Sequence, residues 1–596
     1  MLKEQESFSV QASMLSRSQK AQMRWLSEGD THYNLKHYEE ALAAYEQAQC
    51  MKPSNAVAYT ARGNALFSLK RYKEALTVYQ QALDLDPTHF CAYIGLGCTL
   101  WKLAQPLEAL SMHEQGLELD PACVSAYIGK ADALWKLKRY QEALATYETA
   151  LSLDPSSAHA LNGKGNTLYK LQQYEAALCF YEQTLERNPL DAALWCNKAD
   201  ACSRLARYSE ARAAYEHVIS IDPSHAHAFN GLGNTCCVFD LDEQALAAYD
   251  SACQLNPKEP LLFYNKGNAL LKLDRDEEAL AAYDQALVLD PACTLAHNAR
   301  GELLFRLGRD EEALAACERA ISSDHCNDAA YNNKGNILYK LKRYEQALAA
   351  YRQAVRLNPY ASILHYNQAL VLDCLRRYEE ALASYERCLR LDPNDAYAYN
   401  NSGNVLYRLG RHCKALSSYE QAIALHPNES IFHANRASIL VFQNRYEEAL
   451  LAWETVIALD PNDWQAYASK GNILVQLAHD EDALAAYESA IRLNPDNAHL
   501  YNDLATVFIS LERYGEALGA AERATRLDPD QSIANTTMGN ALASLAYYAQ
   551  ALAAYERALY FDRNNADAYK GMGNVLWELY RFDEALTAYQ QVMQVQ

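Results

Sequence analysis

The sequence is poor in features that mark several common classes of protein. Its 596 residues contain no run of about 20 apolar residues, so we expect no membrane-spanning helix. The first residues, MLKEQESFSVQASMLSRSQKA, have no sustained apolar stretch and no cleavage site, so we expect no signal peptide. The 54 basic residues are outnumbered by 75 acidic ones, and the net charge of −21 disfavours nucleic acid as a partner.

Motifs for disulfides, metals and catalysis are also lacking. The 16 cysteines include no C-x-x-C and share no spacing, which favours free thiols in a reducing cytoplasm. No phosphate-binding G-x-x-x-x-G-K-[ST] occurs, and Gly163-Lys-Gly165 lacks the third glycine of a dinucleotide motif. His225-x-His227 has no third ligand at a fixed spacing. We therefore expect no cofactor, no metal site and no enzymatic activity.

Proline is scarce, but its placement reveals the organisation of the chain. Fourteen of the 16 prolines lie on a lattice with a step of 34 residues, running from Pro53 to Pro529. His325 and Arg563 hold the two lattice points that lack proline. A fixed period of this length indicates stacked copies of one supersecondary unit. With the lattice residue at position 32, seventeen repeats begin at residues 22, 56, 90, 124, 158, 192, 226, 260, 294, 328, 362, 396, 430, 464, 498, 532 and 566.

The repeats follow one another without insertion or deletion, which predicts one array rather than several domains. Residues 22–596 are expected to form a single solenoid. Residues 1–21 form a polar leader, which we expect to be partly disordered or to begin the first helix.

Each repeat shows two helical stripes. In the repeat DAAYNNKGNILYKLKRYEQALAAYRQAVRLNPYA, which begins at residue 328, Tyr331, Gly335 and Leu338 share one helix face. Ala347 and Tyr351 belong to a second stripe, and the phase changes near position 16. The Asn-Pro pair at positions 31 and 32 ends the second helix. Each repeat is therefore predicted to be a pair of antiparallel helices.

Small residues recur at fixed positions of the repeat. Position 20 is alanine in all seventeen repeats, position 8 is glycine in twelve, and position 24 is tyrosine in thirteen. A glycine inside a helix costs about 1 kcal/mol relative to alanine, so this glycine needs a compensating gain. We expect a close approach of two helix backbones, with the tyrosine filling the space beside them.

This pattern resembles the tetratricopeptide repeat, whose preferred residues at positions 4, 8, 20, 24 and 32 are met by Tyr399, Gly403, Ala415, Tyr419 and Pro427. The resemblance covers residues 22–596, and the chain is similar to the repeat domain of O-linked N-acetylglucosamine transferases, without a catalytic domain. It implies an all-α, right-handed superhelical solenoid in which the first helix of each pair lines a concave groove. It also implies binding of a peptide or partner protein.

Asparagine recurs on the face of the first helix that lies opposite its apolar stripe. Such a series could hold the main chain of an extended peptide, since each amide both donates and accepts hydrogen bonds. The alternative is that these amides bind neighbouring repeats. Position 9 contributes Asn64, Asn166, Asn234, Asn268, Asn336, Asn404, Asn472, Asn540 and Asn574, and position 6 contributes Asn197, Asn265, Asn333, Asn367, Asn401 and Asn435.

A basic track is predicted beside these asparagines. Position 13 is basic in eight of the ten repeats from the third to the twelfth, while position 25 of the second helix is acidic in fourteen of seventeen. We expect the groove to prefer acidic segments, the alternative being solvated side chains that cover apolar neighbours. The basic residues are Lys102, Lys136, Lys170, Arg204, Lys272, Arg306, Lys340 and Arg408.

The favoured interpretation is a non-enzymatic scaffold that binds a peptide or partner protein in its groove. One alternative is a scaffold that self-associates through its last repeat, which has no polar capping helix. Another is a substrate-targeting partner of a glycosyltransferase.

Overall fold

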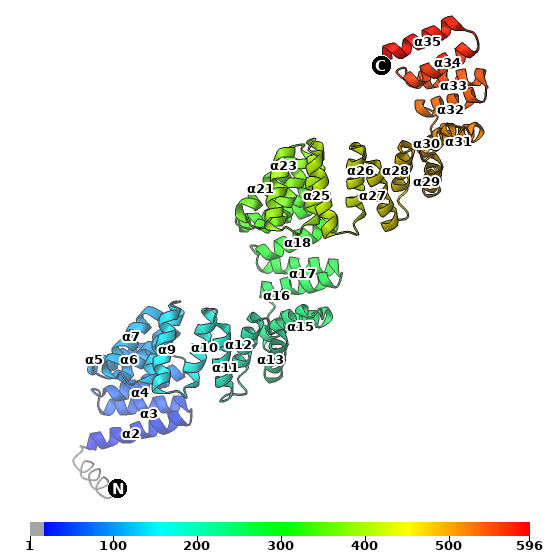
Figure 1. The fold of residues 1–596 in the computed structure, drawn as a ribbon. Helices are drawn as coiled ribbons and strands as arrows, with labels where there is room; N and C mark the ends of the chain where they lie inside the picture. The colour runs from blue at the N-terminus through cyan, green and yellow to red at the C-terminus, as the bar shows by residue number, and fades with distance from the viewer. Residues whose placement is uncertain (1–16, 596) are drawn as a thin grey trace. The chain divides into compact units, whose positions relative to one another are not determined.

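The computed structural model describes residues 17–595, which contain 34 α-helices and no strand. The predicted all-α solenoid of helix pairs is confirmed, and Figure 1 labels the helices along the chain. Among the described residues, no helix combines the length and hydrophobicity needed to cross a membrane.

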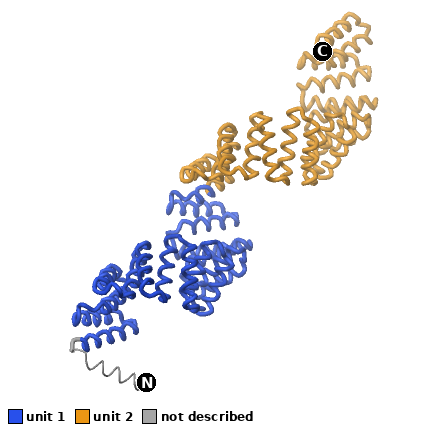
Figure 2. Tube along the Cα trace, turned by 60° about the vertical axis from the view of Figure 1, so that its left-hand side comes forward, with its two compact units in different colours: residues 1–299 blue, residues 300–596 orange. Residues whose placement is uncertain are grey.

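The chain divides into two compact units, Met1–Ala299 and Arg300–Gln596 (Figure 2), and the boundary falls within α18 (Thr294–Arg306). The other helices of unit 1 are α2 (Arg17–Asn34), α3 (Tyr38–Met51), α4 (Ala56–Ser68), α5 (Tyr72–Leu85), α6 (Phe90–Lys102), α7 (Pro106–Leu119), α8 (Val124–Lys136), α9 (Tyr140–Leu153), α10 (Ala158–Lys170), α11 (Tyr174–Leu185), α12 (Ala192–Arg204), α13 (Tyr208–Ile221), α14 (Ala226–Val238), α15 (Asp242–Leu255), α16 (Pro260–Lys272) and α17 (Asp276–Leu289).

Unit 2 continues the same alternation of first and second helices. Its helices after α18 are α19 (Asp310–Ser323), α20 (Asp328–Lys340), α21 (Tyr344–Leu357), α22 (Ser362–Cys374), α23 (Tyr378–Leu391), α24 (Ala396–Arg408), α25 (His412–Leu425), α26 (Ser430–Phe442), α27 (Tyr446–Leu459), α28 (Trp464–Gln476), α29 (Asp480–Leu493), α30 (Ala498–Ser510), α31 (Tyr514–Leu527), α32 (Ser532–Ser544), α33 (Tyr548–Phe561), α34 (Ala566–Glu578) and α35 (Phe582–Val595).

Many of the first helices begin after a residue whose side chain binds a free backbone amide. In most repeats from the fifth onward, an Asn, Asp or Ser side chain caps the first helix, as Asn327 does by accepting from the amide of Ala330 at 2.9 Å. Pro106 and Pro260 occupy the first turns of α7 and α16, where a missing amide proton costs little. Helix α2 starts at Arg17, so residues 17–21 of the predicted leader are helical, and the rest of the leader lies outside the described residues.

The turn between the two helices of each repeat has a left-handed backbone conformation that could not be predicted from the sequence. Position 15 has a positive φ in all seventeen repeats, yet glycine fills it only at Gly308 and Gly410. At Lys342, where φ is 58°, the amide donates to Tyr339 O, and the next amide, of Arg343, donates to Leu338 O at 2.8 Å. These bonds satisfy carbonyl groups at the helix end and hold a non-glycine residue in the left-handed region.

Alanine at position 20 lies at the centre of the packing in both units. Its side chain is 0% exposed in every one of the seventeen repeats, from Ala41 to Ala585. The invariance predicted from sequence therefore corresponds to a contact with no spare volume, where an added methylene cannot be accommodated without movement.

Ion pairs link neighbouring repeats and stiffen the turns. In several repeats the acidic residue at position 25 pairs with a basic residue at position 7 of the next repeat, as in Lys164–Glu148 at 3.0 Å and Lys334–Glu318 at 2.8 Å. Within repeats, an arginine at position 16 binds a glutamate at position 19 through two nitrogens, and in most of these pairs it lowers the pKa of the glutamate. These pairs are largely exposed, so each contributes little stability and mainly favours one register.

Substituting Ala347 by leucine tests the packing at position 20. We expect a loss of about 1–3 kcal/mol because the larger side chain overpacks a site with no exposure. Ala349→Leu is the matched control, since Ala349 lies in the same helix with its side chain exposed, and we expect a change within about 0.5 kcal/mol. Hydrogen exchange of the amides in α20 and α21 measures both effects locally, and equal protection in the two variants would contradict the packing assignment.

Candidate peptide-binding surface

The tyrosine at position 24 of the second helix packs against the first helix, which carries the predicted binding face. Its ring lies directly on the glycine at position 8: a Cβ added to Gly335 would meet Tyr351 Cε1 at 2.5 Å. Five glycines at position 6 meet the ring at position 24 of the preceding repeat in the same way, as Gly163 meets Tyr147. The small residues therefore make room for an aromatic ring, and the tyrosine fills the space beside them as expected from the sequence.

The same tyrosine fixes the asparagine at position 9. In all nine repeats with this asparagine, the tyrosine hydroxyl donates to its Oδ1 at 2.6–2.9 Å. Three other repeats have aspartate there, and their tyrosines donate to Asp30, Asp132 and Asp200. Because an ionised aspartate can only accept, the shared geometry supports the same donor role for the hydroxyl opposite asparagine.

The asparagine at position 6 bonds to the preceding repeat. Asn265 Nδ2 donates to Asn230 Oδ1 at 2.9 Å, and Asn367 Nδ2 donates to Asn332 Oδ1 at the same distance. Asn197, Asn401 and Asn435 make equivalent bonds to a residue at position 5 of the repeat before them, and Asn333 is half-buried. The amino groups of these five position-6 asparagines therefore bond to the preceding repeat, whereas the asparagine at position 9 bonds to the tyrosine of its own repeat.

Most of these asparagines have one amide atom without a partner among the hydrogen bonds described above: Nδ2 at position 9 and, in four repeats, Oδ1 at position 6. Among residues 17–595, the Nδ2 groups of the nine position-9 asparagines donate to no other protein group, and these side chains are half-buried or exposed. At position 6, the Oδ1 atoms of Asn197, Asn265, Asn367 and Asn435 accept no bond within that range. The face therefore offers repeated donors beside repeated acceptors.

First helices lie on the inner side of the curvature within each unit. In unit 1, α4 contacts α6, α6 contacts α8, and the series continues to α16; in unit 2 the same holds for α20 to α26 and for α30 to α34. Second helices of neighbouring repeats make no comparable contacts among the described residues. The first helices are consequently the more closely spaced row, as the resemblance implied for a concave lining.

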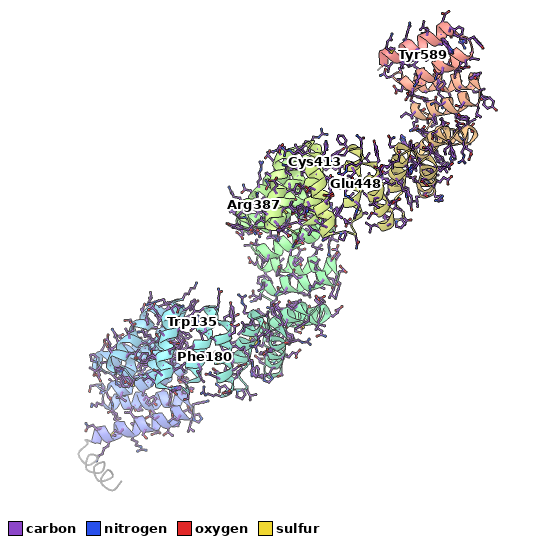
Figure 3. All side chains as sticks on the ribbon, in the orientation of Figure 1. Trp135, Phe180, Arg387, Cys413, Glu448 and Tyr589 are labelled. Atoms are coloured by element: carbon purple, nitrogen blue, oxygen red, sulfur yellow. The ribbon has the colours of Figure 1, made fainter. Side chains whose placement is uncertain are left out.

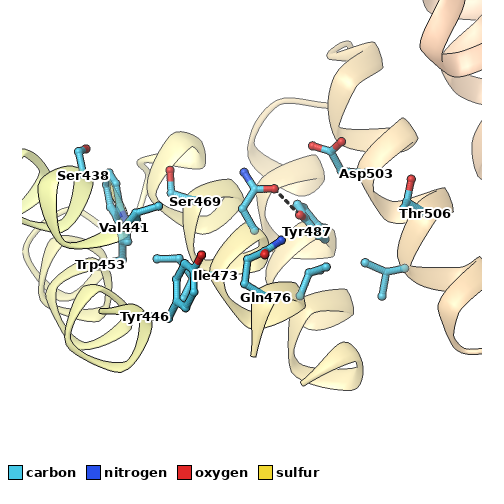
Figure 4. A pocket seen from close by; sticks show the side chains of 13 residues that line it. Ser438, Val441, Tyr446, Trp453, Ser469, Ile473, Gln476, Tyr487, Asp503 and Thr506 are labelled. Carbon is cyan, nitrogen blue, oxygen red and sulfur yellow. Dashed lines mark hydrogen bonds between the residues drawn. The ribbon is translucent and has the colours of Figure 1, made fainter. Parts of the chain in front are cut away.

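Hollows on this side are lined in part by residues at positions 6, 9 and 13. In unit 2, a hollow of about 600 Å³ is lined by Ser469, Asn472 and Gln476 together with Trp453, and Figure 4 shows the bond from Tyr487 to the asparagine. In unit 1, a hollow of about 210 Å³ lies beside Trp135, which is labelled in Figure 3. Such recesses, lined by aromatic and amide groups, suit side chains of a bound segment.

The basic residues at position 13 fall into two groups. Lys272 pairs with Asp240 at 3.3 Å and with Asp242 at 3.5 Å, Lys340 pairs with Asp310 at 2.8 Å, and Arg408 pairs with Asp373. Arg306 is exposed on α18.

The second group, in unit 1, has no carboxylate partner among the described residues. Lys102 and Lys136 lie 4.8 and 5.5 Å from the ring of Trp101, and Lys170 is exposed. Arg204 donates to the hydroxyl of Tyr174 at 3.1 Å. The unneutralised part of the basic track therefore extends from Lys102 to Arg204, and the aromatic residues at positions 12 and 17 that support it were not predicted as site residues.

The fold, the invariant small residues and the tyrosine contacts define a class: tandem helical-hairpin repeat proteins. Profiles described as tetratricopeptide repeat or TPR repeat match residues 26–90, 94–158, 134–195, 192–225, 264–325, 329–360, 377–410, 396–429, 434–478, 470–532 and 534–565. The chain belongs to the tetratricopeptide repeat family. It is thereby a scaffold for protein–protein interaction, and repeats of this family are generally non-catalytic.

Solved structures of similar proteins include the APC/C hetero-tetramer Cut9–Hcn1, with 15% identity over 81% of this chain and 96% of that chain and a TM-score of 0.37. YrrB, described as a TPR protein with an unusual peptide-binding site, is 27% identical over 30% of this chain and 92% of its own, with a TM-score of 0.27. MamA is 19% identical over 27% and 93%, with a TM-score of 0.25. The search of curated proteins found no match.

Removing one tyrosine hydroxyl tests its support of the amide. Tyr351→Phe is expected to lower local stability by about 1 kcal/mol, because Asn336 Oδ1 loses its 2.7 Å bond. Tyr385→Phe is the matched control: its hydroxyl is buried without a hydrogen-bond partner among the described residues, since position 9 of that repeat is Leu370. Hydrogen exchange in α20–α23 should show a loss in the first variant only.

Proposed function

We propose that the first-helix surface binds an extended segment of a partner protein, mainly through the main chain of that segment. The observation that supports this is the division of each amide pair. Tyrosine holds the carbonyl at position 9 and the preceding repeat holds the amino group at position 6, which leaves a donor and an acceptor on the surface. An extended chain needs both groups along its length and imposes little side-chain sequence.

The proposal assigns a charge preference to unit 1. Lys102, Lys136 and Lys170 have no counter-ion within residues 17–595, whereas Lys272, Lys340 and Arg408 are ion-paired. Asp132, four residues before Lys136 on α8, already accepts from Tyr147 and lies 3.1 Å from His159. An acidic segment would therefore meet unneutralised cations between Lys102 and Arg204, with tryptophan rings beside them.

Changing asparagine to aspartate at position 9 removes the Nδ2 donor but keeps the oxygen that accepts the tyrosine hydrogen bond. Asn234→Asp with Asn268→Asp retains an acceptor for the tyrosine, as the chain itself does at Asp200, but eliminates two Nδ2 groups. We expect affinity for a peptide selected from a synthetic library to fall about tenfold, the effect of losing two hydrogen bonds near 0.7 kcal/mol each.

Asn188→Asp with Asn256→Asp is the matched control for this pair. Both residues are exposed before the lattice proline, where several repeats already have aspartate, and the change adds the same charge outside the surface. We expect unchanged affinity. Equal affinities for both double variants would mean that the position-9 asparagines do not bind the ligand.

Charge reversal tests the acidic preference separately. Lys102→Glu, Lys136→Glu and Lys170→Glu together should weaken binding of an acidic library peptide at least tenfold, and the loss should shrink as salt screens the charges. Lys70→Glu, Lys73→Glu and Lys138→Glu give the same change of net charge on exposed residues at positions 15 and 18. Isothermal titration calorimetry compares the two triple variants, and an equal loss in both would attribute the effect to net charge alone.

A further inference from the structure

Three side chains of metal-ligand type converge on the first-helix surface of unit 1. Cys196 and Asp200 lie one turn apart on α12, and His227 extends from α14 of the next repeat. The thiol sulfur, a carboxylate oxygen and a ring nitrogen lie within 4.8 Å of one another. His227 Nε2 is 3.1 Å from Asp200 Oδ2 and 3.2 Å from Oδ1. Cys196 is buried, Asp200 is half-buried and His227 is exposed.

We propose that Cys196, Asp200 and His227 bind one zinc ion. Thiolate, imidazole and carboxylate together form a donor set typical of Zn²⁺, whose bonds of about 2.0–2.3 Å place ligand atoms about 3–4 Å apart. The observed separations need only small side-chain rotations to reach that range. Three protein ligands leave the fourth position of the tetrahedron for water or an outside group, and the exposure of His227 places it at the surface.

A neighbouring hydroxyl already orients the carboxylate. Tyr215 donates to Asp200 Oδ1 at 2.5 Å, and this tyrosine is 3% exposed. The contact leaves Oδ2 for the ion. Hydrogen bonds of this kind hold zinc ligands in a fixed orientation. It belongs to the repeat frame, since Tyr45 donates to Asp30 in the same way.

The chain contains a near-copy of this arrangement that lacks the thiol. His159 Nε2 lies 3.1 Å from Asp132 Oδ2, and Tyr147 donates to Asp132, so two of the three ligand types recur two repeats earlier. The residue equivalent to Cys196 is Ile128. Because this pair offers only two ligands, it serves as an internal control for binding by histidine and aspartate alone.

The sequence concealed the cluster because its members come from two repeats. His225, the histidine closest in sequence to His227, accepts from the amide of Ala228 at 3.2 Å as a helix cap. The ligands instead occupy position 5, position 9 and position 2 of the next repeat, a combination that is visible only when first helices are adjacent. This inference does not depend on the proposed peptide binding.

Cobalt(II) chloride is the probe, because a thiolate ligand gives cobalt an intense near-ultraviolet charge-transfer band that imidazole and carboxylate do not. With the reduced full chain, we expect one equivalent of Co²⁺ to produce this band and one equivalent of Zn²⁺ to abolish it. Cys196→Ser should remove the band. Cys253→Ser, which changes a thiol of similar burial in α15, should leave it unchanged.

The histidines provide a second pair of variants that does not touch a buried residue. His227→Gln should weaken Co²⁺ binding at least about tenfold, whereas His159→Gln should leave it unchanged. Helix content measured by circular dichroism accompanies each titration. The proposal is overturned if no charge-transfer band forms in the wild type, if the band persists in Cys196→Ser, or if the two histidine variants bind cobalt alike.

Discussion

The tyrosine ring at position 24 is the contact on which the repeat depends. In ten repeats it occupies the space above a glycine of its own first helix, and in five repeats the ring at position 24 fills the space over a glycine of the following one. Its hydroxyl anchors the residue at position 9. One side chain thereby joins the two helices of a pair, connects the pair to its neighbour and holds a surface group in place. Repeats built in this way interact mainly with their neighbours, so stability accumulates along each unit.

Exceptions to this contact show how tolerant the frame is. Cys317 and His113 replace the tyrosine and are both buried, and burial lowers the pKa of His113 to about 4. A neutral imidazole can therefore fill the aromatic position without placing a charge in the core. Tyr385 keeps the ring but has no acceptor among the described residues, which indicates that filling the space matters more than the hydrogen bond.

Periodicity was sufficient to predict the helices, their pairing and the invariant core, because each residue type recurs in one environment. Position 20 illustrates this: alanine everywhere corresponds to zero exposure everywhere. The left-handed turns were not predictable, since Lys138 or Gln172 carries no signal for a positive φ. The division of the asparagine amides was equally hidden, because it depends on which atoms of adjacent repeats face one another. For the same reason, the sequence did not predict that Cys196 and His227 lie in one cluster.

The anchored carbonyl at position 9 has a consequence for recognition. An asparagine on an open helix surface rotates among several conformers, and binding must restrict them at a cost of roughly 0.5–1.5 kcal/mol for each flexible side chain. Here the tyrosine hydroxyl has already selected the conformer before any partner arrives. Under the proposed function, this pre-organisation lowers the entropic cost of each contact with the bound segment.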